Sequence, residues 1–187
     1  MVPLMSLWLP IVLSAVVVFV ASSIIHMVLP YHRSDYKKLP DEEGVLAALR
    51  QYSVGPGDYV FPKPDTPGAM KAPAFLEKWS KGPVGMMTIM KRTGAPSMGK
   101  PLAFWFLFCV VISIFAAYIA GRALQTGAPY LSVFRFAGAT AFVAYALGLW
   151  PTTIWFGRAW TATVKSNIDG LIYALLTGGV FGWLWPN

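Results

Sequence analysis

The sequence predicts an all-α integral membrane protein, a bundle of four transmembrane helices with a long and mostly irregular cytoplasmic loop. Of its 187 residues, 56% are hydrophobic and only 12% are charged, whereas an average soluble domain carries about 25% charged residues. Four long stretches are nearly free of charge, and a membrane helix needs about 20 mostly apolar residues to cross the hydrocarbon. Lys and Arg gather between these stretches, as is typical of multi-pass proteins.

The first predicted element is a transmembrane helix in residues 1–29, with its apolar run over residues 4–29. Pro10 lies close to the start of this run, where a missing backbone N–H costs little. Pro30 should end the helix near Val28, because the residue before a proline avoids the helical backbone region.

The second predicted element is the cytoplasmic loop, residues 30–101, which we expect to form a lid on the membrane part. It holds most of the prolines and no stretch apolar enough for an independent core. A short helix is expected from about residue 39 to Tyr52, because acidic residues lie at its start and Arg50 lies at its end. Two later stretches, Asp58–Phe61 and Pro83–Arg92, allow a two-stranded hairpin.

Between those two stretches, Pro73–Lys81 is expected to form one or two helical turns. The remaining region, residues 102–187, predicts three transmembrane helices over 102–121, 136–156 and 168–185. Pro151 should kink or shorten the second of these. Asp169 stands near the start of the last one, where a carboxylate would cap the helix N-terminus.

The distribution of positive charge predicts how the chain is threaded. Residues 30–101 carry eleven of the 15 Lys and Arg, and the two terminal tails carry none. With four crossings, the side that holds the first and third loops has 13 basic residues, and the other side has 2. The positive-inside rule then predicts a bacterial inner-membrane protein with both termini outside. Basic residues beside the spans favour anionic lipid headgroups, and not nucleic acid, as partners.

Both histidines of the chain lie at the end of the first apolar run. His26 and His32 are six residues apart, so on a regular helix their side chains would point about 120° apart. We therefore predict no metal site and no cofactor. His26 alone is kept as a candidate for a single-histidine cofactor site, because ionisable residues at membrane depth are functional candidates by default.

The remaining candidate residues fall into two groups, and no catalytic residue is predicted. One group could form a polar site within the bundle: His26, Asp169, Thr152 and Thr153. The other consists of small residues at four-residue spacing, which allow helices in lipid to approach closely. Its members are Ser113, Ala117, Gly121, Ala137, Ala141, Gly178 and Gly182. We expect them to pack helices within the chain first and between subunits second.

The sequence leaves two functional classes open. The first is a non-catalytic accessory or structural subunit, which packs against a larger membrane complex or a second copy of the chain; an enzyme is less expected. The second is a small transporter, channel or membrane-embedded enzyme for a neutral or lipophilic substrate. A polar cavity that reaches His26 or Asp169 would favour this second class.

Overall fold

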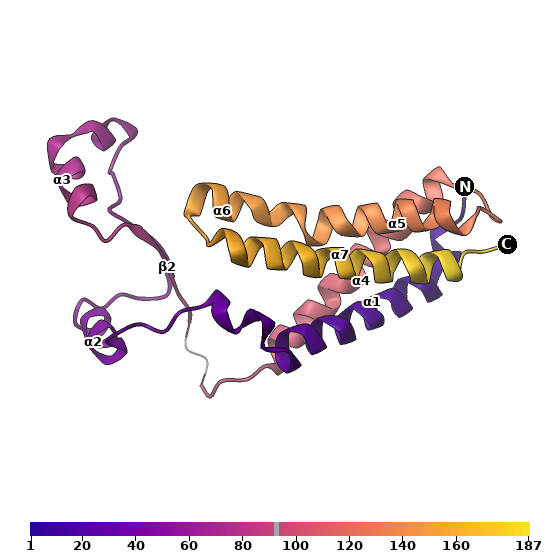
Figure 1. Cartoon of the computed structure of the whole chain (residues 1–187), viewed down its shortest axis with the longest axis horizontal. Coiled ribbons are helices and arrows are strands. Elements are labelled where there is room, and N and C mark those ends of the chain that lie inside the picture. Colours follow the sequence, from indigo (N-terminus) through magenta and orange to yellow (C-terminus); the bar gives the residue numbers. More distant parts are fainter. Residues whose placement is uncertain (92–93) are drawn as a thin grey trace. The chain divides into compact units, whose positions relative to one another are not determined.

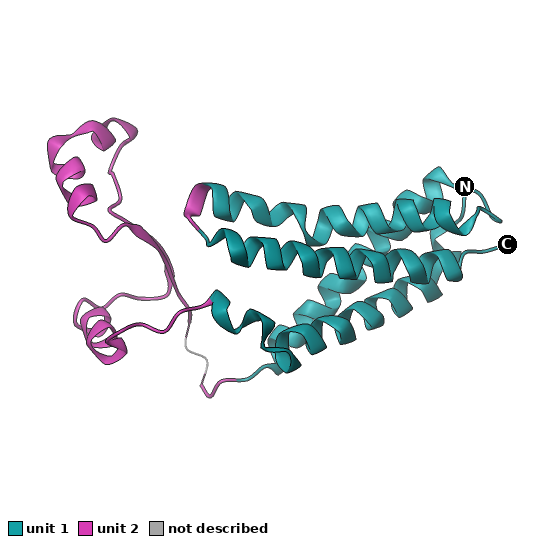
Figure 2. Ribbon diagram, in the orientation of Figure 1, with its two compact units in different colours: residues 1–35, 97–154, 158–187 teal, residues 36–96, 155–157 magenta. Residues whose placement is uncertain are grey.

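The computed structural model describes residues 1–91 and 94–187 and divides into two compact units (Figures 1 and 2). Unit 1 comprises residues 1–35, 97–154 and 158–187, and it is a helical bundle. Unit 2 comprises residues 36–96 and 155–157, and it holds short helices and a small sheet. The structure is mostly helical, as predicted.

The first two long segments of the bundle match the predicted apolar runs. A 3₁₀ turn, Leu4–Leu7, leads into α1, Trp8–Ser23, and a π-helical turn follows over Ile24–Val28. The predicted end near Val28 is confirmed, because Leu29 is extended, with φ −78° and ψ 141°, ahead of Pro30. The second segment, α4, covers Gly99–Ala123 and extends a few residues beyond each predicted end.

The third segment starts earlier than predicted and is broken. It consists of α5, Tyr130–Tyr145, a 3₁₀ turn, Leu147–Leu149, and α6, Trp150–Phe156. The break lies one turn before Pro151, because a proline ring clashes with the carbonyl four residues before it and disturbs the preceding turn.

The fourth segment, α7, covers Trp160–Trp183, so it begins eight residues before the predicted start at residue 168. The prediction that Asp169 caps this helix was therefore wrong. Ala159 is the N-cap residue, and Asp169 lies buried in the third turn. Polar residues ahead of Asp169 do not stop the helix, because Ser166 and Asn167 bond to carbonyls of their own preceding turn.

Three helical segments are long and apolar enough to cross a membrane, which fits a membrane location. They are Leu4–Val28, Gly99–Ala123 and Tyr130–Phe156. The helix α7, which contains the fourth predicted span, is not among them. Asp169 and several glycines lower its hydropathy.

The four segments form a closed ring, in which α1 packs on α4 and α7, and α5 packs on the same two helices. Small residues permit these contacts: a Cβ on Gly178 would lie 2.8 Å from the carbonyl oxygen of Phe134 in α5. The structure buries the predicted small residues Ser113, Ala117, Gly121, Ala137, Ala141 and Gly178 and half-buries Gly182.

One end of the bundle holds both termini (Figure 1). The Val2 amide donates to the carbonyl of Gly121 at the end of α4, at 2.8 Å. The Gly127 amide donates to the carbonyl of Pro186, also at 2.8 Å. Backbone hydrogen bonds therefore tie the N-terminus, the α4–α5 loop and the C-terminus together at this end.

Unit 2 matches the predicted short elements. The first helix, α2, covers Glu42–Gln51, and the second, α3, covers Pro73–Lys81. The strands β1, Gly57–Phe61, and β2, Gly85–Ile89, pair antiparallel as a two-stranded sheet, with α3 in the connection between them. Arg92, the last residue of the predicted second strand, lies outside the described residues. Among the described residues of 36–96, none is buried, and their role as a lid stays a prediction.

Candidate functional site

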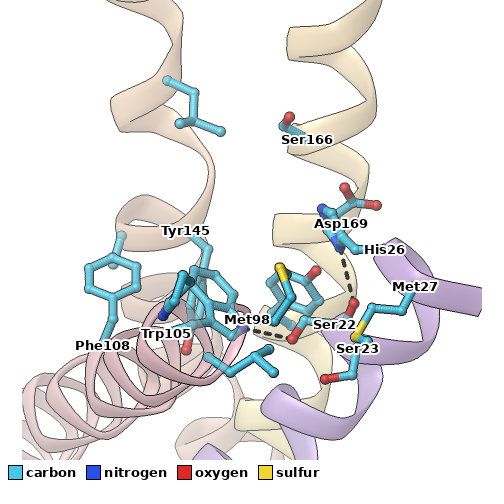
Figure 3. Close-up of a pocket in the computed structure, with 15 residues that line it drawn as sticks. Ser22, Ser23, His26, Met27, Met98, Trp105, Phe108, Tyr145, Ser166 and Asp169 are labelled. Carbon is cyan, nitrogen blue, oxygen red and sulfur yellow. Dashed lines mark hydrogen bonds between the residues drawn. The ribbon is translucent and has the colours of Figure 1, made fainter. Parts of the chain in front are cut away.

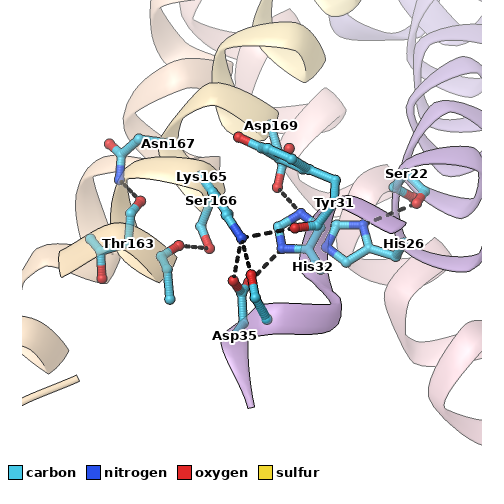
Figure 4. A network of polar contacts seen from close by, with 12 residues as sticks. Ser22, His26, Tyr31, His32, Asp35, Thr163, Lys165, Ser166, Asn167 and Asp169 are labelled. Carbon is cyan, nitrogen blue, oxygen red and sulfur yellow. Dashed lines mark hydrogen bonds and ion pairs between the residues drawn. The ribbon is translucent and has the colours of Figure 1, made fainter. Parts of the chain in front are cut away.

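Two local backbone features bring the histidines together at the end of the bundle where α7 begins. His26 lies in the π-helical turn, and the chain then bends at Pro30 into a 3₁₀ helix, Pro30–Asp35, which carries His32. The two rings stack with centroids 4.4 Å apart and planes 6° from parallel (Figure 4). The expectation that the side chains point apart was wrong, because it assumed one regular helix through both residues.

Asp169 of α7 completes a cluster of three potential ligands. One donor atom each from His26, His32 and Asp169 lies within 4.8 Å of the other two. Nε2 of His32 lies 2.8 Å from Oδ2 of Asp169, close enough for an ion pair when the imidazole is protonated. Oδ1 of Asp169 is buried without a hydrogen-bond partner among the described residues.

The Nδ1 atom of each histidine lies within hydrogen-bond distance of an acceptor oxygen. Nδ1 of His26 lies 3.1 Å from the backbone carbonyl of Ser22, one helical turn earlier. Nδ1 of His32 lies 2.6 Å from Oδ2 of Asp35. Neither acceptor can donate a hydrogen bond when Asp35 is ionised, so both Nδ1 atoms carry the hydrogen.

Lys165 of α7 fixes the segment that carries His32. Its ammonium group donates to the carbonyl of Tyr31 and the hydroxyl of Ser34, each at 2.8 Å, and to Oδ1 of Asp35 at 2.9 Å. Burial would raise the pKa of Asp35, but hydrogen bonds from His32 and Lys165 outweigh it and hold that pKa below its usual value. Burial also raises the pKa of Tyr31. Asp35 therefore stays a carboxylate that orients His32.

A cavity of about 450 Å³ adjoins the cluster, and its wall is mostly apolar (Figure 3). His26 and Asp169 belong to its lining, and so do Trp105, Tyr145 and Tyr173. The Trp105 indole N–H donates to the Ser22 hydroxyl at 2.7 Å. The hydroxyl groups of Tyr145 and Tyr173, by contrast, are buried and have no hydrogen-bond partner among the described residues.

The four residues of the predicted polar site do not all come together in the structure. His26 and Asp169 meet in the cluster and line the cavity. Thr152 donates to the carbonyl of Leu149 at 2.6 Å, and Thr153 hydrogen-bonds to Thr163 of α7. Neither threonine is part of the cavity wall.

Sequence reasoning missed His32 as a member of the cluster and Asp35 and Lys165 as the residues that hold His32 in place. One local signal was present: Lys165 and Asp169 are four residues apart, and on a helix this spacing places two side chains on one face. The partners of that face come from a segment more than a hundred residues away, and no local pattern indicates them.

Comparison of the chain with protein-family models, with curated proteins and with solved structures gives no significant match. The function must therefore be argued from the site. Two imidazoles, two carboxylates and one ammonium group at the end of an apolar cavity can hold a cation, exchange protons or bond to the polar head of a lipophilic molecule.

Proposed function

We propose that the chain is a membrane protein that binds a small neutral or lipophilic molecule within its helical bundle, as a transporter or a membrane-embedded enzyme. The observation that carries this proposal is the cavity of about 450 Å³. Protein interiors are close-packed and contain few voids larger than a water molecule, whereas ligand pockets commonly measure about 300 to 1,000 Å³. A cavity of this size therefore supports a ligand.

The chemistry of the wall supports a ligand with an apolar body and a polar head. Trp105 and Phe108 offer aromatic surface, and His26 and Asp169 offer hydrogen-bonding groups at one part of the wall. The buried hydroxyl of Tyr173, which also lines the cavity, has no hydrogen-bond partner among the described residues. An unsatisfied buried donor costs about 1 to 3 kcal/mol, so a ligand that bonds to it would gain affinity.

Native mass spectrometry of the purified full chain tests this function, with 1-dodecanol as the probe. We expect a one-to-one complex with the wild-type chain. Ala144→Phe should abolish it, because Ala144 lines the cavity and the added ring would fill it. Val143→Phe is the matched control: its residue neighbours Ala144, is 57% exposed and does not line the cavity. Equal binding by both variants, or none by the wild type, would overturn the proposal.

A non-catalytic accessory subunit is the second candidate, and one observation favours it. Residues 36–96 include no buried residue in their described part, and their side chains Leu76 and Trp79 are each about half exposed. Apolar groups of this kind can pack against a larger partner. The same mass measurement separates the two functions, because a stoichiometric larger protein would favour the subunit and a small-molecule complex the binding protein.

We further propose that α7 is a fourth span and that both termini face outward in a bacterial inner membrane. The N-terminus and the C-terminus lie at the same end of the bundle, where backbone hydrogen bonds hold them beside the end of α4 and the α4–α5 loop. This arrangement supports an even number of crossings. Lys165 and Asp169, the charged residues of α7, both have charged or ionisable partners. These partners lower the free-energy cost of placing the two side chains within the membrane. The excess of Lys and Arg in residues 30–101 supports a cytoplasmic loop.

Reporter fusions test this topology. Alkaline phosphatase fused after Asn187 should be active, because that enzyme folds only outside the cytoplasm. Green fluorescent protein inserted at Gly55 should fluoresce, because it folds inside. The reverse pattern would overturn the orientation. An inactive phosphatase after Asn187 together with fluorescence at Gly55 would overturn the fourth span.

A further inference from the structure

We propose that His26, His32 and Asp169 form a binding site for a divalent transition-metal ion, with Zn²⁺ as the reference ion. Two imidazole nitrogens and one carboxylate are a common ligand set for such ions. The site consists of these three side chains, and metal binding does not depend on whether the cavity binds a lipophilic molecule.

The distances suit a metal ion. Ligands that lie about 2.0 to 2.2 Å from a tetrahedral zinc ion are separated from one another by about 3.3 Å. Nε2 of His32 and Oδ2 of Asp169 are 2.8 Å apart, and the donor atoms of the three residues all lie within 4.8 Å. The third ligand, His26, is exposed and its ring stacks directly on that of His32, so it lies beside the other two.

Each histidine is held in the way that metal-binding histidines are held. The Nδ1–H of His26 donates to the Ser22 carbonyl, and that of His32 donates to the Asp35 carboxylate. When Nδ1 carries the hydrogen, Nε2 of the neutral ring keeps the lone pair that binds a metal. Lys165 in turn holds Asp35 in place. The cluster thus has both ligands and their orienting partners.

An unpartnered oxygen of the cluster also points to a cation. Oδ1 of Asp169 is buried and lacks a hydrogen-bond partner among the described residues. A bound cation would interact favourably with this atom.

A purely structural role for the cluster would have a protonated His32 bridge Asp35 and Asp169. That role accounts for the 2.8 Å contact between Nε2 of His32 and Oδ2 of Asp169. It has no use for His26, whose ring stacks 4.4 Å from that of His32. Metal binding accounts for all three residues.

Three protein ligands leave one position of a tetrahedral ion open, as in catalytic rather than structural zinc sites. His26 and Asp169 also belong to the cavity wall. The open position would therefore be available to the polar head of a molecule in the cavity.

Metal binding is tested on the tag-free full chain in detergent, after removal of metal with a chelator. Isothermal titration should show one Zn²⁺ bound per chain, and Co²⁺ should give the visible absorption of a tetrahedral site. His26→Gln is the decisive variant, because His26 is exposed and makes no ion pair with a described residue. We expect it to stay folded, by circular dichroism, and to bind Zn²⁺ at least about 10-fold more weakly.

Asp169→Asn should weaken Zn²⁺ binding at least as much, whereas Glu77→Gln, which changes an exposed carboxylate of unit 2, should not. Ala144→Phe should keep Zn²⁺ binding and lose only the alcohol, so the two proposals fail separately. Absence of stoichiometric Zn²⁺ binding by the wild type, or equal affinity in wild type and His26→Gln, would overturn the site.

Discussion

The bundle and unit 2 each contain a short lysine–carboxylate contact, and the two contacts differ in burial. In the bundle, Lys165 lies 2.9 Å from Asp35, with side chains 20% and 6% exposed. In unit 2, Lys81 lies 2.6 Å from Glu77, with side chains 72% and 64% exposed. Water and salt screen the second pair far more than the first. Burial, and not distance, therefore decides which contact stabilises the protein.

The glycines of the two units differ in the same way. Gly178 of α7 lies against the backbone of α5, whereas Gly55 of unit 2 would have nothing within 4 Å of an added Cβ. The comparison predicts that equal substitutions destabilise the bundle and leave unit 2 nearly unchanged.

The largest expected effect comes from Gly178→Val. Its Cβ would lie 2.8 Å from the Phe134 carbonyl oxygen, a backbone atom that cannot move without displacing α5. Overpacking of this kind destabilises by about 3 kcal/mol. Thermal unfolding in detergent, followed by circular dichroism, should show a clear drop in Tm.

Gly55→Val is the control for this prediction, because its added side chain meets open space. Its stability should stay within about 0.5 kcal/mol of the wild type. Similar losses in both variants would mean that the close approach of Gly178 to α5 does not govern the response.

A smaller effect is expected from Lys165→Met, which keeps most of the aliphatic length and removes the charge. The change deletes three hydrogen bonds and leaves Asp35 with His32 as its remaining partner. Hydrogen bonds to charged groups contribute about 1.5 to 3 kcal/mol, so we expect a loss of about 2 kcal/mol in the free energy of unfolding, measured by denaturant titration.

Lys81→Met is the matched substitution in unit 2 and should cost no more than about 0.5 kcal/mol, as exposed ion pairs do. High salt should reduce even this small difference. If Lys81→Met were as damaging as Lys165→Met, burial would not be the deciding variable.

Much of the fold could be predicted because its signals are local. Apolar runs determine three helices, and Pro30 alone determines where the first one ends. The start of α7 was predicted too late because the charge of Lys165 is typical of a loop between membrane helices, and its partners cannot be identified from the sequence. Those partners, such as Asp35, come from a distant part of the chain.

The candidate site was predicted only in part, and for a similar reason. His26 was selected by its depth in an apolar run and Asp169 by its place at the start of one, but their contact depends on backbone geometry that no sequence pattern specifies. A π-helical turn and a 3₁₀ turn replace the regular helix between His26 and His32. The rotation between two side chains depends on the kind of helix that joins them, and the expectation for a regular α-helix therefore separated two rings that stack.

The smallest expected effect tests whether unit 2 unfolds separately from the bundle. Asp41 is the N-cap of α2, and its Oδ1 accepts from the Gly44 amide at 3.1 Å. Asp41→Ala should destabilise α2 by about 1 kcal/mol, which speeds amide exchange in α2 about 5-fold. Because α2 and the bundle belong to different compact units, exchange in α4 should not change. Faster exchange in α4 as well would show that the two units unfold together, and the contrast between them would then lie in single contacts and not in whole units.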